Sequence, residues 1–133
     1  MGDSLTDKVA IVTGAGRGIG RGVAKMMAEE GAKVVVVDPG VNVDGSGVDS
    51  SVAEQVVAEI RQAGGTACAV QCDVGMSGDV STAMDQVVSE LGGIDIMVCN
   101  AGIIRQSNIV DMAEDEWDLI IRNNLKSVFL CSQ

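Results

Sequence analysis

The sequence predicts an α/β protein with a doubly wound parallel sheet. Short, valine-rich apolar runs alternate along the chain with longer segments whose apolar residues recur at helical spacing. The first run, residues 9–12, ends in a cluster of glycines and opens directly into an amphipathic segment, and a second run follows at residues 34–37. Strand, helix and strand in this order form a βαβ unit, whose right-handed crossover makes the two strands parallel neighbours.

Four strands and four helices are expected in alternation. Each strand is a short run of apolar, mostly β-branched or small residues, and each helix carries an apolar stripe at three- and four-residue spacing. Glycines follow the first three helices, and Ser50, Ser51 and Ser77 are candidate helix caps. No internal repeat or linker interrupts the alternation, so we predict one domain over residues 1–133. The expected strands cover residues 9–12, 33–38, 66–71 and 94–99, and the helices cover residues 19–30, about 51–63, 77–91 and 114–133.

Composition argues against several classes of function. The 133 residues carry a net charge of −10, which disfavours nucleic acid or an anionic membrane surface as a partner. No apolar run approaches the ~20 residues of a membrane span, and the N-terminus lacks the regions of a signal peptide, so we expect a cytoplasmic protein. The four cysteines form no C-x-x-C pair and histidine is absent, so we expect no metal site.

The glycine cluster after the first strand predicts a phosphate site. A strand that turns through glycines into a helix N-terminus aims backbone N–H groups and the positive end of the helix dipole at one point. The dinucleotide spacing G-x-G-x-x-G does not fit when counted from Gly14, whereas Thr-Gly-x-x-x-Gly-x-Gly does. We expect Gly14 to let the chain turn out of the strand and Gly18 to let the backbone approach a phosphate. Gly20 should let the helix pack close to the sheet. A glycine-rich turn without a ligand is the alternative.

Asp38 lies twenty positions after Gly18 and ends the second strand, where an acidic residue meets the adenosine ribose. A carboxylate there accepts hydrogen bonds from both ribose hydroxyls and repels a 2′-phosphate. Arg17 favours the opposite choice, because a guanidinium in the glycine turn can bind a 2′-phosphate. We weigh the placed carboxylate more heavily and predict NAD as the cofactor, with NADP as the alternative. A simple turn residue before Pro39 is the other interpretation of Asp38.

Together with further motifs in the same order, these residues resemble the short-chain dehydrogenases/reductases from Lys8 to the end of the chain. Residues 123–129, Asn-Asn-Leu-Lys-Ser-Val-Phe, resemble the family's helix motif, in which the asparagine before the leucine belongs to the catalytic group. That residue is Asn124. Asp73-Val74 resembles the pair that meets adenine, and residues 100–102 resemble the motif after the fourth strand. The resemblance thus implies cofactor binding by Gly14, Gly16, Arg17, Gly18, Ile19, Gly20, Asp38, Asp73, Val74, Asn100, Ala101 and Gly102.

The resemblance also carries implications for fold and activity. It implies a Rossmann-like sheet with strand order 3-2-1-4, whose later strands are missing from these residues. It implies an NAD(P)-dependent oxidoreductase that interconverts a small-molecule alcohol and ketone. It further implies a homo-oligomer, a dimer or tetramer, in which the helix containing Trp117 packs against its copy. That apolar stripe is equally explained as ordinary core.

The sequence departs from the family's catalytic pattern. In the family a tyrosine transfers the substrate proton, assisted by a lysine and a serine, and all three lie beyond the asparagine motif. These 133 residues contain no tyrosine and end at Gln133, in the helix that carries Asn124. We therefore expect a chain truncated before the catalytic Tyr/Lys segment and inactive by itself, with activity in the full-length parent. A non-catalytic nucleotide-binding half-domain is the alternative, and a methyltransferase would leave Asn100 and Asn124 unexplained.

Residues 39–51 are rich in glycine, serine and aspartate and predict a long surface loop near the adenine end of the cofactor. The pattern resembles a calcium loop only loosely, because no glutamate stands at the closing position. The loop is similar to that of some family members that act on acyl-CoA thioesters, which is a hint about the substrate.

Overall fold

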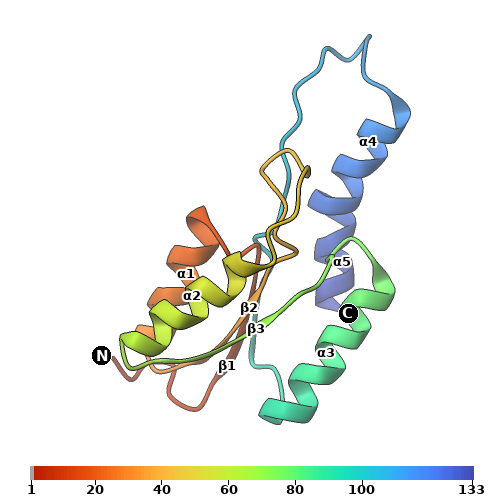
Figure 1. Ribbon diagram of the computed structural model, residues 1–133. Helices are drawn as coiled ribbons and strands as arrows, with labels where there is room; N and C mark the ends of the chain where they lie inside the picture. Colours follow the sequence, from red (N-terminus) through yellow and green to blue (C-terminus); the bar gives the residue numbers. More distant parts are fainter. Residues whose placement is uncertain (1) are drawn as a thin grey trace.

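The computed structural model describes residues 2–133 and has the predicted α/β architecture (Figure 1). Its four strands form one parallel sheet in the order β3-β2-β1-β4, which confirms the expected topology. The elements are β1 (Val9–Thr13), α1 (Gly18–Glu29), β2 (Lys33–Val37), α2 (Ser51–Gln62), β3 (Thr66–Val70), α3 (Ser77–Leu91), β4 (Ile96–Val98), α4 (Glu114–Ile121), the π-helical turn η1 (Arg122–Lys126) and α5 (Ser127–Ser132).

The sheet winds in two directions from its central strand. β1 pairs with β2 from Val9 opposite Lys33 to Thr13 opposite Val37, and with β4 on its other side from Ala10 opposite Ile96. The chain moves outward from β1 through β2 to β3 and then crosses back to β4. The winding direction therefore reverses between β1 and β4. In open α/β sheets, ligands bind at this switch point, beyond the carboxyl ends of the strands.

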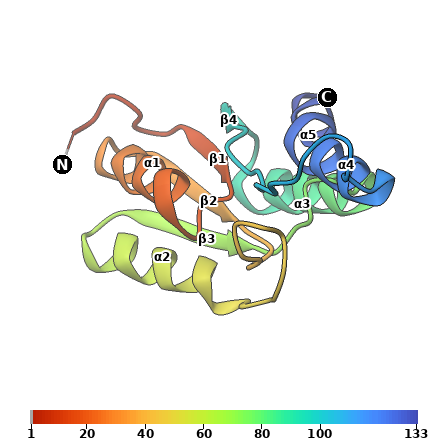
Figure 2. The same ribbon diagram turned by 90° about the horizontal axis from the view of Figure 1, so that it is seen from above.

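Helices cover both faces of the sheet (Figure 2). Successive residues of a strand point to opposite faces of the sheet. The central strands β1 and β2 therefore contribute side chains to one apolar core on each face. On one face, Ala10 and Val12 of β1 pack with α1 and α2; on the other, Val9 and Ile11 pack mainly with α3. Burial on both faces explains why β1 and β2 are continuous apolar runs rather than alternating ones.

The structure corrects two local predictions. The helix expected over residues 114–133 contains a π-helical turn, η1, between α4 and α5, and the periodicity of the apolar residues gave no sign of it. The serines predicted as caps do not cap with their side chains. Asp49 provides the contact at the start of α2, where its Oδ1 accepts hydrogen bonds from the N–H of Ser51 at 3.0 Å and from its hydroxyl at 2.6 Å.

The β4 side of the described chain carries exposed apolar surface. β4 pairs only with β1 within residues 2–133, and its three residues are half-buried. The helices beside it expose large side chains, namely Trp117, Leu125, Val128 and Phe129. No helix described in residues 2–133 combines the length and the apolar character that a membrane crossing requires.

Alanine substitutions at two glycines of α1, Gly20 and Gly22, should change the stability of the protein in opposite directions. A Cβ at Gly20 would collide with the carbonyl oxygen of Gly14 and with Nδ2 of Asn100, whereas a Cβ at Gly22 would meet no atom within 4 Å. We expect Gly20→Ala to destabilise the full-length gene product by about 1–3 kcal/mol through overpacking. The matched control Gly22→Ala should stabilise it by about 0.5–1 kcal/mol, because alanine loses less backbone entropy in a helix. Urea unfolding measures both, and equal midpoints for the two variants would contradict the close packing at Gly20.

Candidate cofactor site

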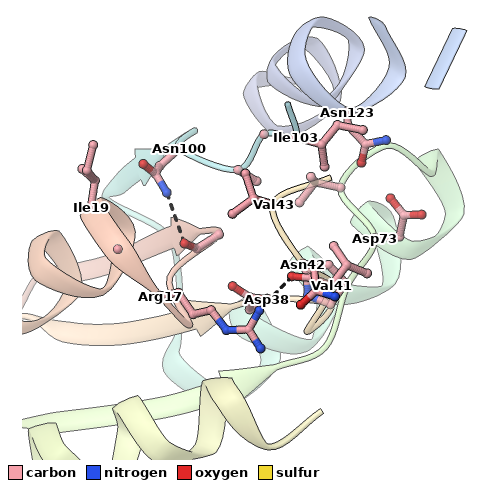
Figure 3. Close-up of a pocket in the computed structure, with 16 residues that line it drawn as sticks. Arg17, Ile19, Asp38, Val41, Asn42, Val43, Asp73, Asn100, Ile103 and Asn123 are labelled. Carbon is pink, nitrogen blue, oxygen red and sulfur yellow. Dashed lines mark hydrogen bonds between the residues drawn. The ribbon is translucent and has the colours of Figure 1, made fainter. Parts of the chain in front are cut away.

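A pocket of about 340 Å³ lies where the strands β1, β2 and β4 end (Figure 3). The glycine turn, the ends of β2 and β4, the turn after β3 and the start of η1 all contribute to its wall. Of the residues predicted to bind a cofactor, Gly14, Arg17, Gly18, Ile19, Asp38, Asp73, Val74, Asn100, Ala101 and Gly102 line this pocket. The structure thus brings together side chains from four separate loops.

The glycine turn combines a tight bend with an open approach. Gly14 has a φ of 63°, and a Cβ there would lie 2.8 Å from Cα of Ala101. Gly18 has a φ of 54° and begins α1, and a Cβ there would meet no atom within 4 Å. The first turn of α1 contains no acidic residue, so its N–H groups and dipole face the pocket without a competing carboxylate. The turn therefore suits a phosphate, which the sequence predicted.

Gly16 does not line the pocket but holds its acidic end in place. Its N–H donates to Oδ2 of Asp38 at 2.8 Å, and the N–H of Gly40 donates to Oδ1 at 2.7 Å. A Cβ at Gly16 would lie 2.9 Å from Asp38 Oδ2, so a larger residue would push the carboxylate away. An ionised carboxylate has about four acceptor positions, so Asp38 keeps acceptor capacity toward the pocket.

Arg17 lies on the same side of the pocket as Asp38 (Figure 3). Its Nη1 donates to the carbonyl oxygen of Val41 at 3.3 Å, in an exposed position. The guanidinium is therefore attached to the loop after β2 rather than to the carboxylate. Both groups considered for the choice between NAD and NADP therefore line the same pocket.

Thr13 and Asn100 join the ends of β1 and β4. The buried hydroxyl of Thr13 accepts hydrogen bonds from the N–H groups of Asn100 at 3.0 Å and Ala101 at 3.1 Å, and donates to the carbonyl oxygen of Val98 at 3.3 Å. In return, Nδ2 of Asn100 donates to the carbonyl oxygen of Thr13 at 3.0 Å and to that of Gly14 at 3.2 Å, the second of which Figure 3 shows. Asn100 thus holds the backbone of the glycine turn, and Gly20 allows α1 to approach this amide.

Asn124, the predicted catalytic residue, does not line the pocket. Its side-chain Oδ1 accepts from the N–H of Ile103 at 2.8 Å, and its Nδ2 donates to the carbonyl oxygen of Ile103 at 2.9 Å. This pair of bonds ties η1 to the segment after β4. The neighbouring Asn123 lines the pocket instead, and its Nδ2 bonds the carbonyl oxygen of Leu119 at 2.9 Å. π-Helical turns are frequent at functional sites. In η1 the amide of Asn123 lines the pocket, whereas the amide of Asn124 binds the backbone of Ile103.

The loop of residues 39–51 reaches further than the sequence predicted. Val41, Asn42 and Val43 line the pocket together with Ile103, across from the glycine turn. The loop is attached to the segment after β4, because the N–H of Ile104 donates to the carbonyl oxygen of Val43 at 2.8 Å. In Figure 1 the two segments rise side by side above the sheet. Sequence analysis missed these wall residues, since the signal for them is a contact between segments about sixty positions apart in the chain.

The cysteines belong to the core rather than to the site. Burial raises the pKa of Cys72 to about 12, and burial next to Cys99 raises the pKa of Cys131 to about 11. Both thiols therefore stay protonated near neutral pH and offer no thiolate nucleophile or ligand. Within residues 2–133, no three His, Cys, Asp or Glu side chains gather in a way that could hold a metal ion.

Comparison with known proteins agrees with this geometry. A family model described as short chain dehydrogenase matches residues 8–133. The chain belongs to the short-chain dehydrogenase family. The 3-oxoacyl-[acyl-carrier-protein] reductase FabG of Staphylococcus aureus is 44% identical over 126 residues, which are 95% of this chain and 48% of that protein. The peroxisomal multifunctional enzyme A of Dictyostelium discoideum is 44% identical and matches 100% of this chain and 30% of its own length.

Solved structures of short-chain dehydrogenases have the same fold. A short-chain type dehydrogenase/reductase from Mycobacterium marinum matches with a TM-score of 0.88 and 40% identity, over 98% of this chain and 49% of that one. A short chain dehydrogenase from Mycobacterium avium matches with a TM-score of 0.87 and 43% identity, over 96% of this chain and 44% of that one. The chain thus spans about half the length of the FabG relatives and of these two structures.

The hydrogen bonds of the Thr13 hydroxyl predict how substitutions at this position change the stability of the protein. Thr13→Val removes the acceptor of the part-buried N–H of Ala101 and one of the two acceptors of the Asn100 N–H, which keeps the carbonyl oxygen of Val98 at 3.1 Å. We expect the full-length gene product to lose about 2–3 kcal/mol of unfolding free energy. Thr13→Ser is the matched control, because it keeps the hydroxyl and should cost only about 1 kcal/mol for the lost methyl group. Urea unfolding measures both, and a loss in Thr13→Val no larger than the loss in Thr13→Ser would contradict the role of the hydroxyl.

Proposed function

We propose that the full-length gene product is an NAD-dependent oxidoreductase that moves hydride between a small-molecule alcohol or ketone and the nicotinamide, with residues 2–133 forming the cofactor-binding half. The observation that supports this best is the position of the pocket. It lies at the switch point of the sheet, between the N-terminus of α1 and a carboxylate at the end of β2. Family membership adds support for a nicotinamide cofactor.

Each part of the pocket fits one part of a dinucleotide. The open backbone at Gly18, at the positive end of α1, suits the pyrophosphate. The fixed carboxylate of Asp38 suits the two hydroxyls of the adenosine ribose, and Asp73 with Val74 suits the adenine edge. Asn100 and its neighbours suit the nicotinamide half, because they follow β4 on the opposite side of the turn.

The bound cofactor would supply the hydride, and this chain would supply its orientation. Asn124 holds the backbone of Ile103, which lines the pocket beside the residues after β4. Its proposed role in the catalytic group is therefore to fix this wall and, through it, the geometry of the reacting end. The 133 residues contain no tyrosine, so the proton donor that the family resemblance implies is not among them.

The substrate class is proposed only broadly. The name of the Staphylococcus aureus relative describes reduction of a 3-oxoacyl group on a carrier protein, which is a ketone reduction. This agrees with an alcohol or ketone as the substrate here. The hint toward acyl thioesters that the loop of residues 39–51 gave stays a prediction.

Asp38 provides the test of the cofactor. We expect the wild-type full-length gene product to bind NADH more tightly than NADPH, as measured by fluorescence titration. Asp38→Asn should weaken NADH binding roughly tenfold, because hydrogen bonds to a charged acceptor are lost. The same change should strengthen NADPH binding, because the repulsion of the 2′-phosphate is relieved.

The opposite signs separate a change in specificity from general damage, which would weaken both cofactors. Asp85→Asn, on the exposed side of α3, removes the same charge away from the pocket and should change neither affinity. If the wild type binds NADPH more tightly than NADH, Arg17 rather than Asp38 determines the cofactor preference. Tight binding without any turnover of alcohols or ketones would favour the non-catalytic half-domain.

We further propose that the protein is a homo-oligomer, since the α4 to α5 region exposes Trp117 and Phe129 by 51% and 60%. Phe129→Glu should reduce the mass of the full-length gene product in light scattering, because a charge enters an apolar contact. The control Val110→Glu alters a residue that is 87% exposed and lies before α4, and it should leave the mass unchanged. A monomeric wild type would refute this proposal.

A further inference from the structure

Arg122 connects two walls of the pocket, and no motif gave it a role. It begins η1, directly before Asn123, and its side chain extends to the turn between β3 and α3. Its Nη2 lies 3.8 Å from Oδ2 of Asp73, and its Nη1 lies 3.9 Å from Sδ of Met76, the residue before α3. The guanidinium therefore contacts the turn that supplies the proposed adenine pair.

The stem of the arginine packs on Gly75. A Cβ at Gly75 would lie 2.9 Å from Cγ of Arg122 and 3.2 Å from its Nε. Gly75 is not among the glycines with positive φ, so its backbone does not require glycine. The missing side chain makes room for the arginine. Nε of Arg122 is buried and meets no acceptor within residues 2–133.

The turn that Arg122 contacts is compact but lies at the edge of the pocket. Oδ1 of Asp73 accepts from the N–H of Gly75 at 2.9 Å, and the carbonyl oxygen of Asp73 accepts from the N–H of Met76 at 3.0 Å. These bonds shape the turn internally, but they do not attach it to the opposite wall. Among the contacts described here, the side chain of Arg122 provides that attachment.

We propose that Arg122 is a positioning residue, which holds the turn of residues 73–75 at a fixed distance from η1 and so sets the adenine-side width of the cofactor pocket. This inference rests on the proposed cofactor function. An exposed ion pair by itself contributes little, and both charged side chains are more than one-third exposed. The stem, packed on Gly75, directs the guanidinium at Asp73 and Met76, so the position of the turn depends on the stem and the guanidinium together.

Three variants of the full-length gene product test this role. Arg122→Met keeps an unbranched apolar stem and removes the guanidinium, and Arg122→Lys keeps a cation. Gly75→Ala leaves the arginine in the sequence but displaces its stem, and its Cβ also lies 3.2 Å from Oδ1 of Asp73, so this variant supports the role of Arg122 only together with Arg122→Met. Lys126→Met is the matched control, because it removes a cation from the exposed side of the same π-helical turn.

We expect Arg122→Met and Gly75→Ala to weaken the binding of ADP-ribose, which is the cofactor without its nicotinamide, at least fivefold. The KM for the cofactor should rise by a similar factor while kcat stays within twofold, since the reacting end is held by other residues. Arg122→Lys should weaken the binding of ADP-ribose less than Arg122→Met does. The double variant Arg122→Met/Gly75→Ala should bind ADP-ribose no more weakly than Arg122→Met alone. Lys126→Met should change none of these values.

Amide hydrogen exchange of the unliganded protein separates this inference from the proposed function. The N–H groups of Gly75 and Met76 should exchange at least tenfold faster in Arg122→Met, while those in the middle of α3 are unchanged. If the wild type binds no dinucleotide but exchange is still faster in Arg122→Met, the proposed function is refuted and the positioning of the turn remains supported. Three results in Arg122→Met would each overturn the role of Arg122. They are unchanged exchange, ADP-ribose binding as tight as in Lys126→Met, and a fall in kcat as large as the rise in KM.

Discussion

The hydrogen bonds between Thr13 and Asn100 are the constraint on which the pocket depends. β1 and β4 are neighbours in the sheet, but sheet pairing alone ends at Val12 and Val98. Beyond that point the hydroxyl of Thr13 and the amide of Asn100 take over, with bonds of 3.0 to 3.3 Å that leave neither group unpaired. Buried polar groups that are fully satisfied add rigidity and specify one arrangement. The glycine turn and the wall after β4 therefore share one frame.

The fold and the core of the site could be predicted from the sequence because their signals are local. A valine run that is buried on both faces has only one compatible environment, the centre of a parallel sheet. The glycine turn was predictable for the same reason, since strand, bend and helix start follow one another within a few residues. The predicted acid at Asp38 lies in the pocket because the carboxyl ends of parallel neighbours meet at one edge.

The features that the sequence did not reveal depend on contacts between distant segments. Nothing in residues 39–51 indicates that Val43 pairs with Ile104, because that bond uses backbone groups, which every residue has. The π-helical turn escaped prediction because the apolar residues of 114–133 were interpreted as one continuous stripe. Within this turn Asn123 lines the pocket and Asn124 holds the backbone of Ile103.

The proposed cofactor is an anion, so the charges near the pocket must be arranged to attract it although the net charge of the chain is −10. Exposed charges more than about 8 Å apart are largely screened at physiological salt, so the nearest groups decide. Both carboxylates at the pocket accept hydrogen bonds from backbone N–H groups, Asp38 from Gly16 and Gly40 and Asp73 from Gly75. These donors partly offset the negative charge, while the N-terminus of α1 and Arg17 add positive potential at the glycine turn. The pocket can therefore attract a phosphate at one point and retain carboxylates for hydroxyl groups at another, which is the distribution that a dinucleotide requires.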